Sequence, residues 1–409
     1  MQDESATPAG GRAATMRQAR LREAAAANAA LGVDLYQVLA PDAPDTVFSP
    51  ASVASALRMA LCGARGQTAA ELARVLHLAG YAKPQDVAAT GLGLTQARLG
   101  SGPGGPGSGS GGGSGGGSAT FRAPDTVWIQ SGFPLGATFK ARLDGAVTYA
   151  GADFAVAPEA ARAEINRVIA DQTEGKITGL LRPGTITALT RLVLASAVYL
   201  KAAWTDPFPE RATADAPFYP DGPDDPALTV PMMRGTAPRA YLRGDGYQAV
   251  LLPYRDIGLA MAVLLPDGPL VTLRPKLAAA GLAGLLAGTA RHQVTLSLPR
   301  FRLEAAFNLI PALRQLGVVA AFGSDADFGE ITEAMPLQIS AVAHKAFIDV
   351  DEQGTEAAAA TAVVMRTMAA MRPPPAVTMV VDRPFLFAIV DTATGLPLFL
   401  GQVSHPAAG

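Results

Sequence analysis

Residues 351–382 read DEQGTEAAAATAVVMRTMAAMRPPPAVTMVVD and lie between two apolar segments, AVAHKAFIDV before them and RPFLFAIV after them. A connection of about thirty residues within a compact domain is uncommon and is usually functional. Its first half has the pattern of a strand, because residues two apart would share one face of a sheet. The residues on that face are all small: Thr355, Ala357, Ala359 and Thr361. Glu356 would point to the opposite face, toward solvent.

The composition of the whole chain is that of a folded protein. Of its 409 residues, 49% are hydrophobic and 17% are charged, unlike disordered chains. A net charge of -2 predicts no attraction to nucleic acid or to an anionic membrane. We find neither a membrane-spanning apolar run nor a signal peptide. We therefore expect a cytoplasmic protein if Met1 is the native start, and an extracellular one if the chain was trimmed.

Cysteine and histidine usage argues against metal chemistry. The single cysteine, Cys62, excludes an internal disulfide and every multi-cysteine metal site. The four histidines lie far apart, and none belongs to an HExxH or HxH pattern. We expect no metal site and no small-molecule cofactor. Cys62 ends an apolar helical stretch, which predicts a buried, unreactive thiol.

Helical patterns dominate the first part of the chain. An amphipathic pattern from Met16 to about Ala40 follows a polar start that we expect to be frayed. A second helix would be capped by Ser49, with Pro50 at its first position. A third would begin at a capping box, Thr68-x-x-Glu71. The segment PEAARAEINRVIADQTEGKI, 158–177, has the clearest helical periodicity.

Strand patterns prevail farther along the chain, without the βα alternation of a doubly wound fold. The segments rich in apolar and β-branched residues are 121–130, 191–204, 239–254, 259–266, 294–305 and 337–350. RPFLFAIV and LPLFLGQV, separated by DTATG, predict a hairpin near the end. Together with the helices, these patterns indicate an α+β fold with mostly antiparallel sheets.

A glycine and serine tract, GSGPGGPGSGSGGGSGGGS, occupies 100–118. This composition predicts a flexible surface insert rather than a linker between domains. Ser114 lies in a GxSxG pattern, the spacing of a hydrolase nucleophile. Since no strand pattern precedes it and no helical pattern follows it, we interpret the match as accidental.

Six segments, in order, resemble the serpin family over nearly the whole chain from about Ala40. They are VFSPASVASALRMALCGARGQTAAEL (47–72), EINRVIADQTEGKITGLL (164–181), TRLVLASAVYLKAAWTDPF (190–208), LPRFRLEAAFNLIPALRQLGVVAAF (298–322), AHKAFIDVDEQGTEAAAATAVV (343–364) and RPFLFAIVDTATGLPLFLGQVSHP (383–406). The Glu-x-Gly-Thr-Glu-Ala-Ala hinge at the start of this long connection makes the match specific.

The resemblance implies an α+β serpin fold with three mostly antiparallel β-sheets, about nine helices and an exposed reactive loop. A flexible tail, 1–15, would precede one domain, 16–409, in which 100–118 is a disordered insert and 352–383 forms the hinge and reactive loop. A serine protease would cleave the loop, whose freed half then inserts as a strand while the protease is still attached as a covalent acyl-enzyme. The implied hinge residues are Glu352, Gly354, Thr355, Glu356, Ala357, Ala358, Ala359, Ala360 and Thr361.

The scissile bond is predicted by counting along the loop. In inhibitory serpins it usually follows the fourteenth residue after the hinge glycine, which gives Met368, with Ala369 on the leaving side. Methionine suits the apolar primary pocket of chymotrypsin-like, elastase-like or subtilisin-like proteases. Arg366 is an alternative that would select trypsin-like targets. Arg372 is a weaker one, because Pro373 would then occupy the leaving position.

Further residues correspond by position to parts of the serpin mechanism. Glu352 and Arg300 match the ion pair at the top of the main sheet, with Trp204 nearby. The region that must part for insertion includes His344, Ser49, Ser52 and Ser196. At Ser196 the family commonly has asparagine, and a serine reaches less far.

The resemblance therefore implies that this chain is a monomeric inhibitor and not an enzyme. Its partner would be a serine protease. Residues 82–100 carry few charges, so we expect no heparin-type cofactor. Three alternatives stay open. The chain could be a non-inhibitory carrier or chaperone, which its alanine-rich hinge disfavours. It could inhibit trypsin-like or cysteine proteases, or be a hydrolase that uses Ser114 or another serine.

Overall fold

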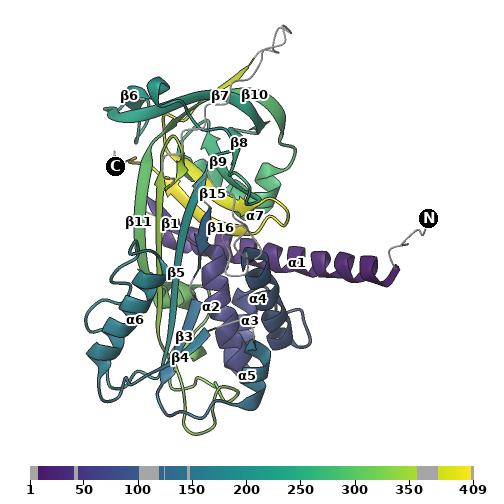
Figure 1. Cartoon of the computed structure of the whole chain (residues 1–409), viewed down its shortest axis with the longest axis vertical. Helices are drawn as coiled ribbons and strands as arrows, with labels where there is room; N and C mark the ends of the chain where they lie inside the picture. Colours follow the sequence, from purple (N-terminus) through teal and green to yellow (C-terminus); the bar gives the residue numbers. More distant parts are fainter. Residues whose placement is uncertain are drawn as a thin grey trace, which may run out of the picture.

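Two β-sheets form the framework of the protein in its computed structural model, which describes residues 8–40, 45–100, 119–123, 125–144, 148–356 and 376–406. Figure 1 shows one sheet running along the length of the molecule, with the second sheet at its upper end. The α-helices of the described residues are α1 (Pro8–Leu39), α2 (Pro50–Gly63), α3 (Gly66–Val75), α4 (Pro84–Gly100), α5 (Ala137–Leu143), α6 (Pro158–Gln172), α7 (Leu273–Leu286) and α8 (Ile310–Gln315). This is the expected α+β fold. In this part of the chain no helix is long and apolar enough to span a bilayer.

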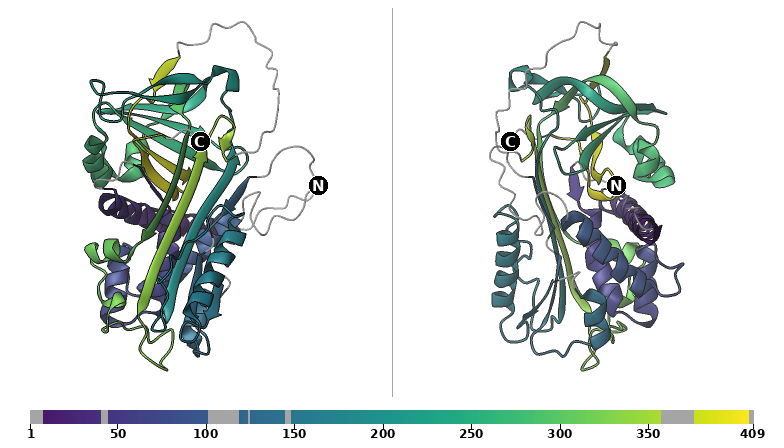
Figure 2. Two further views of the ribbon diagram at one scale, coloured as in Figure 1. Left: turned by 90° about the vertical axis from the view of Figure 1, so that its left-hand side faces the viewer. Right: turned by 45° about the vertical axis from the view of Figure 1, so that its right-hand side comes forward.

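The long sheet has seven strands in the order β11-β12-β13-β5-β3-β4, with β2 paired to β5. Their bounds are β2 (Thr120–Arg122), β3 (Asp125–Gln130), β4 (Thr148–Ala152), β5 (Leu192–Ala203), β11 (Phe301–Asn308), β12 (Ile339–Val350) and β13 (Gly354–Thr355). Helix α6 covers one face and the helices α2 to α5 lie against the other, as both views of Figure 2 show. Since both faces are covered, β5 and β12 are almost continuously buried.

The second sheet has nine strands in the order β1-β16-β15-β9-β8-β7-β10-β14, with β6 paired to β7. Their bounds are β1 (Thr46–Phe48), β6 (Ala214–Phe218), β7 (Leu228–Gly244), β8 (Tyr247–Pro253), β9 (Leu259–Pro266), β10 (Ala290–Pro299), β14 (Val377–Val380), β15 (Phe385–Asp391) and β16 (Pro397–Val403). We expected three sheets, but β7 pairs with β6 at its start and with β8 at its end. It thereby joins two of them into one hydrogen-bonded sheet. The predicted hairpin is confirmed as β15 and β16.

Helix α2 begins as predicted, because the Ser49 side chain accepts a hydrogen bond from the Ser52 amide at 3.1 Å and Pro50 opens the first turn. Helix α1 begins at Pro8 rather than near Met16, so the predicted start of this helix is wrong by eight residues. Figure 1 shows this early part of α1 projecting from the side of the molecule.

The predicted capping box at Thr68 and Glu71 is wrong, because both residues lie inside α3. Their side chains bind a distant segment instead. Thr68 Oγ1 accepts from the Asp327 amide at 3.0 Å. Glu71 accepts from the amides of Val319 and Ala320 at 2.7 and 2.8 Å. The two side chains therefore anchor α3 to this segment.

Candidate functional site: the upper end of the long sheet

The hinge enters the long sheet as the two-residue strand β13. Gly354 pairs with Ala203 of β5, and Thr355 pairs with Ala202 of β5 and with Val350 of β12. A Cβ atom at Gly354 would lie 2.1 Å from the carbonyl oxygen of Ala202, so only glycine fits there. Thr355 is completely buried, and its hydroxyl hydrogen-bonds that of Tyr254 at 2.5 Å. Gly354 and Thr355 of the hinge are therefore already part of the sheet.

Below the hinge, β5 and β12 pair directly with each other. Their parallel register runs from Ile339 opposite Leu192 to Ala346 opposite Val198. The sheet is thus closed along most of these two strands and holds the hinge only between their upper ends. Much of the long loop, 351–382, lies outside the described residues. This applies to the hinge residues Ala357, Ala358, Ala359, Ala360 and Thr361 and to the candidate cleavage residues Arg366, Met368, Ala369 and Arg372, as it does to Ser114.

Glu356 leaves the sheet with a positive φ of 47°, while its amide donates to the Asp349 carbonyl at 2.9 Å. The prediction that it faces solvent is wrong. Its side chain is 15% exposed and pairs with Lys176, which lies in the segment after α6. That segment covers the face of the sheet that the sequence pattern predicted to be exposed to solvent. Burial and the nearby carboxylates, that of Glu356 first, raise the pKa of Tyr199 in the same cluster.

Glu352 and Arg300 lie in contact, at the position that the resemblance implied. Arg300 Nε lies 2.9 Å from both carboxylate oxygens of Glu352, and Thr213 donates a further hydrogen bond. The Glu352 side chain is only 4% exposed, whereas that of Arg300 is 42% exposed. Burial by itself would raise the pKa of Glu352, but the hydrogen bonds from Arg300 and Thr213 outweigh it and lower the pKa.

Trp204 directly follows the last residue of β5 at this end of the sheet. Its ring stacks on Tyr254 with centroids 4.5 Å apart. Its backbone amide donates to the Gln353 carbonyl at 2.8 Å, and its indole N–H donates to the Asp351 carbonyl at 3.0 Å. Two hydrogen bonds from this buried tryptophan therefore help to hold the turn that leads into the hinge.

The four residues expected in the parting region form one buried network across three elements. His344 on β12 lies opposite Ser196 on β5, and its Nδ1 is 3.3 Å from Ser196 Oγ. Its Nε2 accepts from the Ser49 amide at 2.9 Å, so the ring proton of the neutral imidazole is on Nδ1. Ser52 Oγ lies 2.5 Å from Ser196 Oγ. Despite its short side chain, Ser196 bridges β12 and α2, and separating β5 from β12 must break its contact with His344.

The buried His344 makes the stability of the uncleaved protein depend on pH. Burial lowers its pKa from 6.5 to about 4. In the unfolded chain His344 binds a proton as the pH falls below 6.5, whereas in the folded chain it binds one only near pH 4. The free energy of unfolding therefore decreases as the pH falls through this range. The loss is about 3 kcal/mol. We expect the urea midpoint of the uncleaved protein to fall from pH 7 to pH 4.5, and to fall clearly less in His344→Gln. An equal fall in both proteins would contradict this origin.

Several contacts of the site had no signal in the sequence. Tyr254, Thr213 and Lys176 are contributed by segments 100 to 180 residues away from the hinge, and nothing in their spacing pointed to it. Cys62 is buried as predicted, and burial raises the pKa of its thiol to about 12. Among the residues that the structure describes, no cluster of three or more His, Cys, Asp or Glu side chains could hold a metal ion.

The fold and the hinge define the class of protein, because the long loop begins as a short strand, β13, within the long sheet. Residues 26–406 match the family model described as serpin (serine protease inhibitor). An uncharacterized serpin-like protein of Thermococcus kodakarensis is 36% identical, over 92% of this chain and 84% of that protein. Leukocyte elastase inhibitor of Sus scrofa is 33% identical, over 94% and 100%. The crystal structure of Serpin48 of Tenebrio molitor matches with a TM-score of 0.78 and 27% identity, over 94% and 98%. The chain belongs to the serpin family.

Proposed function

We propose that this chain is a suicide-type inhibitor of serine proteases, with chymotrypsin-like, elastase-like or subtilisin-like enzymes as targets. The observation that carries the proposal is the hinge, which lies between β5 and β12 at their upper ends while the same strands pair directly below. Such a sheet is primed to accept the rest of the loop as a further strand. The elastase inhibitor among the relatives supports protease inhibition.

The proposed reaction begins as ordinary proteolysis. The serine oxygen of the protease attacks the Met368 carbonyl, and the resulting ester holds the two proteins together. The bond to Ala369 breaks, and the Ala369 nitrogen leaves as an amine with a proton from the protease histidine. The freed segment then follows Thr355 between β5 and β12. In a strand, Ala357, Ala359 and Thr361 share the inward face of Thr355, where small side chains fit.

Insertion requires a specific set of contacts to break. The direct pairing of β5 with β12 must open, and Ser196 must separate from His344. Two new ladders with the inserted strand replace the one that is lost. We propose that Glu352, Arg300 and Trp204 keep the entrance in register, since Arg300 before β11 and Trp204 after β5 both bind the turn that leads into the hinge.

The test is incubation with chymotrypsin, pancreatic elastase and trypsin. We expect an SDS-stable adduct with chymotrypsin, with elastase or with both. The mass of the released peptide should correspond to a fragment that begins at Ala369. Met368→Arg should transfer adduct formation to trypsin. Cleavage without any adduct would point to a non-inhibitory serpin, and a peptide that begins elsewhere would correct the scissile bond. Ester hydrolysis that disappears in Ser114→Ala would instead support the hydrolase.

A further inference from the structure

A pocket of about 780 Å³ lies between α1, α2, α4 and the segment that precedes α4. Much of its lining is apolar, with Ala24, Ala27, Leu78, Val87 and Leu94 among the residues that form it. None of the hinge, entrance or parting residues contributes to it. Its volume is in the range of small-molecule sites in proteins.

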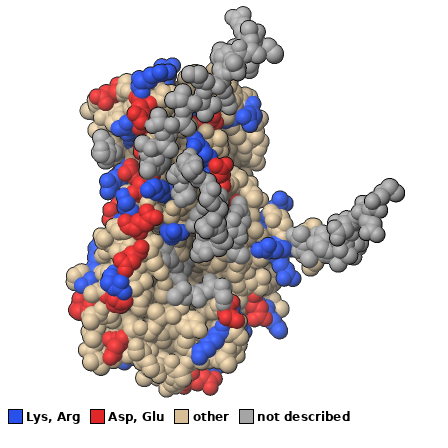
Figure 3. Space-filling view, in the orientation of Figure 1, with Lys and Arg blue, Asp and Glu red and all other residues tan. Residues whose placement is uncertain are grey.

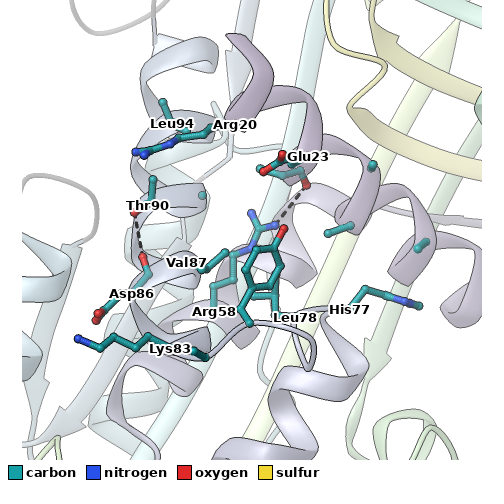
Figure 4. A pocket seen from close by; sticks show the side chains of 17 residues that line it. Arg20, Glu23, Arg58, His77, Leu78, Lys83, Asp86, Val87, Thr90 and Leu94 are labelled. Atoms are coloured by element: carbon teal, nitrogen blue, oxygen red, sulfur yellow. Dashed lines mark hydrogen bonds between the residues drawn. The ribbon is translucent and has the colours of Figure 1, made fainter. Parts of the chain in front are cut away.

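A buried arginine lies at the base of this pocket. Arg58, on α2, is 1% exposed, and Figure 4 shows it between the labelled side chains of α1 and those of the loop and α4. Its Nη2 donates to the Ala24 carbonyl at 3.2 Å, whereas Nε and Nη1 have no partner among the described residues. Burial lowers its pKa to about 10, so the guanidinium is still charged at neutral pH. A buried charge without a counter-ion is costly.

The acidic groups of the pocket do not neutralise this charge. The carboxylate of Asp86 is engaged by Arg142 at 3.3 Å, and Glu23 is exposed on α1. Two further exposed cations, Arg20 and Lys83, line the opening. The charged lining therefore has an excess of positive groups, and the only wholly buried member is a cation.

Unsatisfied polar atoms are concentrated in the same helices. The described part of the chain has seven buried side-chain nitrogen or oxygen atoms without a partner. Five of them belong to Asn28 on α1, Arg58 on α2 and Thr95 on α4. Asn28 lies one helical turn from Ala24, and Thr95 one turn from Gly91. A Cβ atom at Gly91 would lie 3.3 Å from Arg58 Cζ and Nη1, so the glycine leaves room for the guanidinium. Buried polar groups normally have partners, and a cluster without them indicates an absent one.

We propose that this pocket binds an amphipathic carboxylate, an aliphatic chain with one anionic end, whose headgroup pairs with Arg58. The guanidinium fork matches a carboxylate in geometry and in charge. A divalent phosphate would leave one of its two charges uncompensated by the single buried cation. The alanine, leucine and valine side chains of the lining accommodate the aliphatic chain.

Calorimetric titration of the full chain with sodium octanoate tests this site. We expect saturable binding of octanoate, and no binding of 1-octanol or inorganic phosphate at the same concentrations. Arg58→Met keeps the bulk of the side chain and removes the charge, and it should weaken octanoate binding by about tenfold or more. Equal binding of octanoate to Arg58→Met, or binding of phosphate in place of octanoate, would overturn the proposal.

A second pair of variants keeps the test decisive if Arg58→Met fails to fold. Ala27→Phe fills the pocket from the half-buried side of α1 and should abolish octanoate binding. Ala19→Phe makes the same change at an exposed position of α1 that does not line the pocket, and it should bind like the unmodified chain. Absence of octanoate binding to the unmodified chain, or its loss in both phenylalanine variants, would refute the site.

Discussion

Thr355→Arg is expected to convert the protein from an inhibitor into a substrate. Thr355 is completely buried between Ala202 and Val350, with its hydroxyl on that of Tyr254. An arginine there would stay outside the sheet in the uncleaved protein to keep its charge in water, so insertion would have to begin by burying that charge. If this adds about 3 kcal/mol to the barrier, insertion slows roughly a hundredfold. Hydrolysis of the acyl-enzyme is then faster than insertion of the strand. The stoichiometry of inhibition should rise from about one inhibitor molecule per protease toward ten or more.

The matched control is Thr378→Arg. Thr378 is exposed on β14, on the leaving side of the predicted scissile bond, so the same substitution there buries no charge. Gels of each variant with the target protease report both outcomes, since the adduct and the cleaved inhibitor migrate differently. An unchanged stoichiometry for Thr355→Arg, or an equal loss in both variants, would contradict the proposed order of events.

The elements most accessible from the sequence were those defined by local chemistry. Ser49, Pro50 and the apolar run after them predicted the start of α2 correctly, because a cap involves residues only three apart. The periodicity of Ile165 and Ile169 likewise located α6, and both side chains are fully buried against the long sheet. Patterns of this kind depend on interactions within one or two turns.

The sequence predictions were wrong where a side chain binds a distant segment of the chain instead of its neighbours in sequence. Thr68 and Glu71 have the spacing of a capping box, but they bind amides about 250 residues away. Glu356 has the pattern of an outward-facing residue, but Lys176 lies over it. A strand pattern shows which residues share a face of the sheet, but it does not show which segments of the chain cover that face. The residue pairs of the candidate site came from family resemblance, because spacing alone cannot bring Glu352 to Arg300.

Cleavage of the loop is expected to raise the melting temperature greatly. In the uncleaved protein β5 and β12 pair with each other below Thr355. A nick between Thr361 and Arg372 frees the segment after Thr355 to enter between them and to form ladders on both sides. About a dozen added hydrogen bonds at about 1 kcal/mol each, with about 2 °C per kcal/mol for a chain of this size, give a rise of at least about 20 °C.

Scanning calorimetry before and after limited proteolysis measures this rise, and the nicked Thr355→Arg protein is the control that assigns its cause. Both proteins lose the same peptide bond, so any effect of a cut loop alone is common to them. Only the unmodified chain can bury its hinge without burying a charge, so only its melting temperature should rise by the full amount. A similar rise in both would show that relief of loop strain, rather than strand insertion, stabilises the nicked protein. No rise in either would mean that the uncleaved sheet stores no free energy with which to trap a protease.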